Sequence, residues 1–105
     1  MKQVHYAGRS LFMHDDTADA LIDYARALSE HRTADAVTVQ AVSAGGEPIA
    51  VTLLLNEGAA LVVESVPGEV TMEPDRASIE EIQRRRVRLE GVRGGAPDDP
   101  WPLEL

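Results

Sequence analysis

The stretch that decides the fold is DTADALIDYARALSE, residues 16–30. Its apolar residues recur at the i, i+3, i+4, i+7 spacing that lines one face of an α-helix. They are Ala18, Leu21, Ile22, Ala25 and Leu28. Neither Gly nor Pro interrupts the run, and a helix with one apolar face has to bury that face. We therefore predict a helix that begins with Asp16 as its N-cap and packs on a sheet formed by the flanking segments.

The segments on either side of this helix have the patterns of β-strands. Residues 4–13 predict a first strand, or a pair of short strands bent at Gly8. The further predicted strands cover residues 36–42, 49–55 and 59–66, and the pattern also allows a short edge strand at 70–72.

Two local signals bear on how the later strands are arranged. Asn56-Glu57-Gly58 predicts a three-residue hairpin loop that joins the strand before it to the strand after it. The three consecutive leucines at 53–55 indicate a central strand that is covered on both faces. Both signals predict that the later strands form an antiparallel meander.

A second helix is predicted from Ser78 to Gly91. Ser78 and Glu81 have the spacing of a capping box, and Gly91 is placed to end the helix. One face of this helix carries a narrow apolar stripe, which consists of Ile79, Ile82 and Leu89 and is interrupted by Arg86. The following residues, 92–105, contain three prolines and two glycines, which predict an extended tail.

These elements follow in the order β-α-β-β-β-α, which predicts an α+β fold. We expect a two-layer sandwich in which two helices cover one face of a four-stranded, mostly antiparallel sheet. If the first two strands were parallel neighbours, their helical crossover would be right-handed. Residues 1–91 would then form a single domain, and residues 92–105 a Pro/Gly-rich tail.

Composition narrows the classes of protein that the chain can belong to. The 105 residues are enough for one domain with one core. Cysteine is absent, which excludes disulfides, thiolate zinc sites and cysteine nucleophiles. The sequence has no signal-peptide-like start and no apolar run long enough to span a membrane, so we expect a cytoplasmic location. A preference for Arg over Lys, with abundant Ala, Val, Gly and Asp, suggests a GC-rich bacterial genome.

The charge is high and uneven. The net charge of −8 argues against nucleic acid and against anionic membranes as partners. Residues 76–93 contain six Arg and three Glu, whereas residues 1–74 contain four basic and eleven acidic residues. We therefore expect the acidic and basic parts to lie against each other, within one chain or between two.

The residues of metal-binding type are His5, His14, Asp16 and His31. His14 and Asp16 lie in one strand-to-helix turn, but a metal ion needs at least three convergent ligands. The competing interpretation is a helix N-terminus with exposed carboxylates. Ser10, His14 and Asp35 form a Ser-His-Asp set on paper, without the G-x-S-x-G turn of a hydrolase nucleophile. We expect neither a resident metal ion nor a cofactor.

The candidate interaction residues are Arg84, Arg85, Arg88 and Trp101. The arginine fork suits carboxylates or phosphates, but the cluster also fits a solvated helix end that pairs with its own glutamates. Trp101 lies between two prolines, and such a residue is either disordered with its tail or docked in a groove.

The sequence as a whole favours a small non-catalytic interaction module that self-associates or binds a protein partner. An exposed edge strand would give a dimer a route by extension of the sheet. Two alternatives stay open. One is a metal- or small-ligand-binding domain, with or without catalytic activity, at the turn formed by His14–Asp16. The other is binding of RNA or an acidic partner by the arginine cluster.

Overall fold

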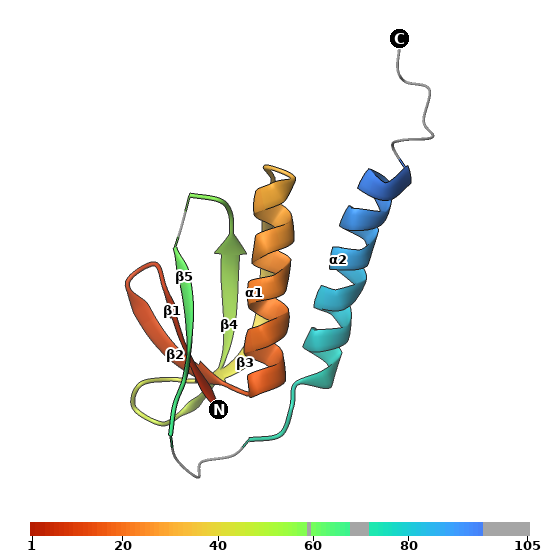
Figure 1. Cartoon of the computed structure of the whole chain (residues 1–105). Helices are drawn as coiled ribbons and strands as arrows, with labels where there is room; N and C mark the ends of the chain where they lie inside the picture. Colours follow the sequence, from red (N-terminus) through yellow and green to blue (C-terminus); the bar gives the residue numbers. More distant parts are fainter. Residues whose placement is uncertain (59, 68–71, 96–105) are drawn as a thin grey trace.

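The fold is a five-stranded antiparallel sheet with two helices packed on it. The computed structural model describes residues 1–58, 60–67 and 72–95, with side chains described as far as Gly91. The elements are β1 (Lys2–Tyr6), β2 (Arg9–Met13), α1 (Asp15–Glu30), β3 (Asp35–Val42), β4 (Pro48–Leu55), β5 (Leu61–Ser65) and α2 (Arg76–Gly95). The strand order is β4-β3-β2-β1-β5, and Figure 1 shows α1 between α2 and the strands β1 and β5. The predicted two-layer α+β class is confirmed, with five strands in place of four.

The fifth strand arises because the first predicted segment is a hairpin. Tyr6 pairs with Arg9, so that only Ala7 and Gly8 form the loop. Both loop residues have positive φ, 51° and 80°, which is the backbone conformation of a tight hairpin turn that matches the twist of the strands. The change of apolar side at Gly8 therefore marks a reversal of the chain.

The predicted β4–β5 hairpin is wrong, because these strands lie at opposite ends of the sheet. Asn56 and Gly58 do form a turn, in which the Asn56 side chain accepts the Gly58 N–H at 2.7 Å. The chain then continues to the far side, where β5 pairs with β1 from Tyr6–Leu61 to Lys2–Ser65. The turn signal is local, whereas the choice of partner strand depends on β1, more than 50 residues earlier.

The predicted central position of residues 49–55 is also wrong. β4 is an end strand, and Leu54 is 58% exposed on the uncovered face of the sheet. Leu53 and Leu55 are buried, as the alternation of side chains along a strand requires. The run of three leucines therefore reflects one solvent-facing leucine between two core residues.

The core lies between the helices and the covered face of the sheet. The buried residues of α1 are Thr17, Ala18, Leu21, Tyr24, Ala27 and Leu28. Ile22 and Ala25, which belong to the predicted stripe, are only half-buried. The buried face is rotated toward Tyr24 and Ala27 because α2 packs along this side of α1.

The predicted caps of both helices are wrong. α1 begins at Asp15, and the N-cap is His14, whose Nδ1 accepts the Asp16 N–H at 3.0 Å. α2 begins at Arg76, and the Asp75 carboxylate accepts the Ser78 N–H at 3.3 Å. Asp75 is favoured over Ser78 because the same carboxylate also binds the sheet, as described below.

The C-terminal end of α2 differs from the prediction as well. The helix passes through Gly91 and ends at Gly95, so it includes the first residues of the predicted tail. The remainder of that tail, including Trp101, lies outside the described residues. So do Val70 and Thr71 of the possible edge strand, whereas Met72 is irregular.

Candidate interaction site

The interior of the sheet contains an unusual junction between β2 and β3. These neighbours pair at one position only, Phe12 with Val42. Beyond this position, β2 no longer pairs with β3. Side chains of the α2 region instead hydrogen-bond to the backbone groups on that side of β3. The bonds join Asp75 Oδ2 to the Gln40 N–H (2.9 Å), Ser78 Oγ to the Thr38 carbonyl (3.1 Å) and an Arg85 nitrogen to the Ala36 carbonyl (3.0 Å). A helix thus satisfies backbone groups that a strand would otherwise pair.

These bonds fix the direction of the backbone groups in β4. Gln40 gives its N–H to Asp75, so the facing pair Gln40–Ala50 is not hydrogen-bonded. Hydrogen-bonded and non-hydrogen-bonded pairs alternate along an antiparallel ladder. Thr52 and Leu54, two and four residues further on, therefore also form non-hydrogen-bonded pairs with β3, as Ala50 does. All three direct their N–H and C=O groups away from β3, toward the outer edge of β4.

The outer edge of β4 has no partner strand among residues 1–58, 60–67 and 72–95. One of its carbonyls is used, because the Tyr6 hydroxyl donates to the Leu54 carbonyl. Pro48, at the start of the strand, has no N–H to offer. The backbone groups of Ala50 and Thr52 lie between these two ends.

Between Pro48 and the Leu54 carbonyl, the β4 strand lacks the features that usually protect a sheet edge. Its sequence, PIAVTLLL, contains no charged residue, and its proline occupies only the first position. The other edge strand, β5, is shorter and carries the exposed Glu64. The contrast identifies the outer edge of β4 as the candidate interaction site.

The uncovered face next to this edge is weakly polar. The side chains of Ala50, Thr52 and Leu54 are exposed there, and Thr52 Oγ1 lies 2.8 Å from Thr38 Oγ1 on β3. Val62 of β5 is also on this face and is 47% exposed. On β4, these exposed side chains and the outer edge together form an uncharged surface on a chain of net charge −8, whereas the β5 end of the same face carries the exposed Glu64.

The predicted arginine cluster is partly occupied by its own chain. Arg85 binds Glu81 at 2.8 Å and Asp35 at 2.9 Å, and Arg84 binds Glu81 at 2.6 Å. Arg88 is exposed and has no ion pair with any residue that the structure describes. Arg84 and Arg88 therefore remain on the solvent side of α2, whereas Arg85 fastens α2 to the sheet.

Asp35 connects α1, α2 and β3. Its carboxylate accepts the Tyr24 hydroxyl at 2.6 Å and the Arg85 guanidinium at 2.9 Å. Burial alone would raise the pKa of Asp35, but the bonds from Tyr24 and Arg85 outweigh it and lower this pKa. Burial and the bond to Asp35 raise the pKa of Tyr24 to about 12. The bonds from Arg85 and Arg84 lower the pKa of Glu81 to about 2.

We expect acid to weaken the docking of α2. The pKa values of Asp35 and Glu81 are lower in the folded chain, so the unfolded chain binds more protons as the pH falls from about 4.5 toward 2. The stability that these groups contribute is present above this window and is lost within it. Thermal melts at several pH values should show a steep fall for the wild type and a shallower one for Asp35→Asn. Parallel pH profiles for the two proteins would contradict the role given to Asp35.

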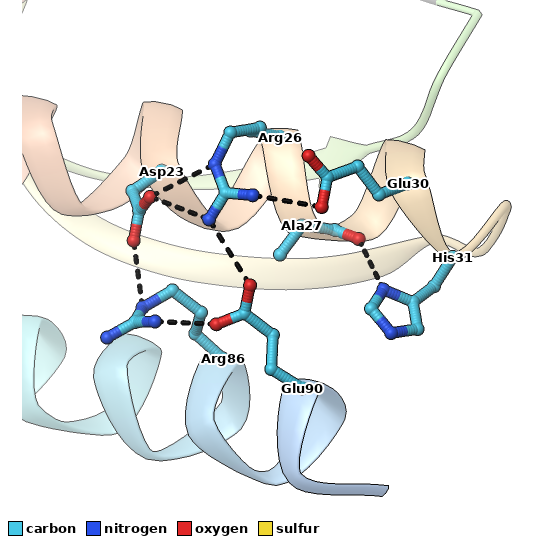
Figure 2. A network of polar contacts seen from close by, with 7 residues as sticks. All are labelled: Asp23, Arg26, Ala27, Glu30, His31, Arg86 and Glu90. Atoms are coloured by element: carbon cyan, nitrogen blue, oxygen red, sulfur yellow. Dashed lines mark hydrogen bonds and ion pairs between the residues drawn. The ribbon is translucent and has the colours of Figure 1, made fainter. Parts of the chain in front are cut away.

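The facing sides of α1 and α2 are joined by an ion-pair network (Figure 2). Arg26 binds Asp23, Glu30 and Glu90 at 3.0 to 3.3 Å. Arg86 binds Asp23 at 2.8 Å and Glu90 at 2.7 Å. The acidic first part of the chain and its basic helix therefore meet within one molecule. These side chains are partly exposed, so each pair contributes little by itself.

The histidines lie in separate places. His14 caps α1, and His31 Nδ1 donates to the Ala27 carbonyl at 2.8 Å (Figure 2). Asp16 is exposed beside His14, and His5 is on β1. No group of three or more His, Asp or Glu residues in the described ranges is arranged to hold a metal ion. Melting-temperature shifts with Zn²⁺, Mn²⁺, Mg²⁺ and Ni²⁺ would test the ligand-binding alternative.

One polar cluster was missed by the sequence reasoning. Ser10 Oγ lies 2.9 Å from His5 Nδ1, and His5 Nε2 lies 2.6 Å from Glu64 Oε1, across β2, β1 and β5. The two-residue turn at Ala7 and Gly8 sets the His5–Ser10 pair and could have revealed it. The side chains of His5 and Glu64 are 37% and 57% exposed, so water screens the charges that such a cluster would use in catalysis.

The fold and the site define a small α+β domain with an open, uncharged sheet edge. Comparison of the chain with protein-family models, with curated protein sequences and with solved structures gave no match. None of the helices in the described part of the chain combines the length and apolar composition needed to cross a membrane.

Proposed function

We propose that the protein is a small non-catalytic interaction module that associates with a second copy of itself through β4. The observation that carries this proposal is the outer edge of β4, a strand of eight uncharged residues whose Ala50 and Thr52 direct backbone groups outward. Long edge strands of this kind readily pair with another strand.

The charge of the chain supports a second copy as the occupant. Two chains of net charge −8 repel each other wherever carboxylates come close. The uncharged β4 is a place where they can approach without that cost. An antiparallel pair of identical strands is also self-complementary about a two-fold axis, which is the commonest symmetry of soluble assemblies.

The decisive variant is Thr52→Pro. Proline removes the Thr52 N–H, which points to the outer edge, and leaves the bonds between β4 and β3 in place. The loss of two symmetry-related hydrogen bonds, with the ring in the path of the partner strand, should raise the dimer dissociation constant by roughly 100-fold. Light scattering at tens of micromolar should give twice the chain mass of 11.4 kDa for the wild type and one chain mass for the variant.

The matched control is Thr52→Val, which loses the hydroxyl bond to Thr38 but keeps the backbone N–H. It should remain dimeric. Circular dichroism should show that Thr52→Pro keeps its secondary structure, so that loss of the dimer is not loss of the fold. A wild-type protein that stays monomeric up to millimolar concentration would overturn the proposal.

A further inference from the structure

We infer that the two copies pair in one register, centred on Val51. This inference rests on the proposed self-association and specifies its geometry. In this register, Val51 faces Val51 of the second copy, Ala50 faces the partner's Thr52, and Pro48 faces the partner's Leu54. The result is a continuous ten-stranded antiparallel sheet.

The direction of the backbone groups limits the choice of register. Outward-directed groups belong to Pro48, Ala50, Thr52 and Leu54, because these positions face the non-hydrogen-bonded positions of β3. Hydrogen bonds form only where outward residues of the two copies stand opposite each other. Two such registers overlap nearly all of β4, one centred on Val51 and the other on Thr52.

The ends of the strand favour the register centred on Val51. There Pro48, which lacks an N–H, faces the partner's Leu54, whose carbonyl already accepts the Tyr6 hydroxyl of its own chain. The position that lacks an N–H donor thus faces a carbonyl that already accepts a hydrogen bond. The Leu54 N–H, which points outward, meets the unused carbonyl of the partner's Pro48. Both possible bonds form between Ala50 and the partner's Thr52.

The register centred on Thr52 leaves more of these backbone N–H and C=O groups without a hydrogen bond. It places Ala50 opposite the partner's Leu54, so that the Ala50 N–H competes with Tyr6 for one carbonyl. It also places Pro48 opposite the partner's Asn56, which lies beyond the end of β4. Since an unmade bond at a buried interface costs free energy, this register is the weaker one.

Cysteine cross-linking distinguishes the two registers, because the chain contains no cysteine of its own. In the register centred on Val51, the two copies of Val51 form a non-hydrogen-bonded pair with Cα atoms about 4.5 Å apart, a distance that a disulfide spans. The two copies of Thr52 are then offset by two residues and lie about 8 Å apart, too far to be bridged. In the other register, these relations are reversed.

The experiment compares Val51→Cys with Thr52→Cys, oxidised with glutathione disulfide at tens of micromolar and run on a non-reducing gel. Val51→Cys should give most of the protein as a covalent dimer, and Thr52→Cys little, although Thr52 is the more exposed residue. The reduced variants, checked by light scattering and circular dichroism, should be folded dimers like the wild type.

The outcomes separate the register from the association itself. Cross-linking of Thr52→Cys in place of Val51→Cys, or equal yields from both, would overturn the register while self-association stands. Folded, dimeric variants that do not cross-link would do the same. A monomeric wild type would end the proposed function and this inference together.

Discussion

Replacing Leu21 with alanine is expected to lower the free energy of unfolding by about 3 kcal/mol. Leu21 is 0% exposed at the middle of α1 and belongs to the core cluster that joins this helix to β1, β2, β3 and β4. Truncation removes apolar contacts and leaves a cavity that the surrounding side chains fill only in part. Urea denaturation at a fixed protein concentration measures the change, since the proposed dimerisation would add to apparent stability.

The control for this prediction is Val87→Ala. Val87 is an apolar residue on α2 that is 59% exposed, so its truncation should change stability by less than about 0.5 kcal/mol. A loss of similar size in the two variants, or a Leu21→Ala protein as stable as the wild type, would remove Leu21 from the centre of the core.

The second large effect is expected at Asp35. Replacement by alanine should cost about 2 kcal/mol, because it leaves the Tyr24 hydroxyl without its acceptor and removes one of the two acceptors of Arg85 Nη1. A double-mutant cycle with Tyr24→Phe should give a coupling energy above about 0.5 kcal/mol. Asp19→Ala serves as the control, since Asp19 forms an exposed ion pair with Lys2 and should cost less than about 1 kcal/mol.

Additive effects of Asp35→Ala and Tyr24→Phe would argue against this network. Equally mild effects of Asp35→Ala and Asp19→Ala on stability would also argue against this network. In either case, the attachment of α2 would depend on its other contacts, which include the buried Ile82 and the bonds to the β3 backbone.

The parts of the fold that the sequence predicted are those set by short-range periodicity. The apolar spacing over 16–30 located α1 to within two residues, because a helix repeats every 3.6 residues whatever it packs against. The alternation in 36–42 located β3 in the same way. The buried face of α1 was displaced toward Tyr24, because that depends on where α2 lies.

The parts that failed depend on long-range partners. Ser78 has the residue type and spacing of a cap, but Asp75 caps α2 because it also binds the Gln40 N–H of β3. Leu54 looked like a core residue because a local run of leucines does not reveal which strand lies alongside. The exposed edge was expected in general terms, but its location at β4 depends on the pairing of β5 with β1.

The candidate site was out of reach for the same reason. Nothing in the composition of β4 states that its outer side is unpaired. That follows only from the strand order and from the three bonds that Asp75 and α2 make to β3. The arginine cluster was the more visible feature in the sequence, yet Arg85 serves the internal attachment of α2.

The substitution of a helix for a strand along β3 has a consequence for biosynthesis. α2 follows every strand in the described part of the chain, so a growing polypeptide displays β3 with one side unpaired until about 40 further residues have left the ribosome. During that interval, the nascent sheet has a second edge with unpaired backbone groups, in addition to the outer edge of β4. Chains interrupted before Asp75 should therefore aggregate during translation. In chains that include α2, Asp75, Ser78 and Arg85 hydrogen-bond to this side of β3.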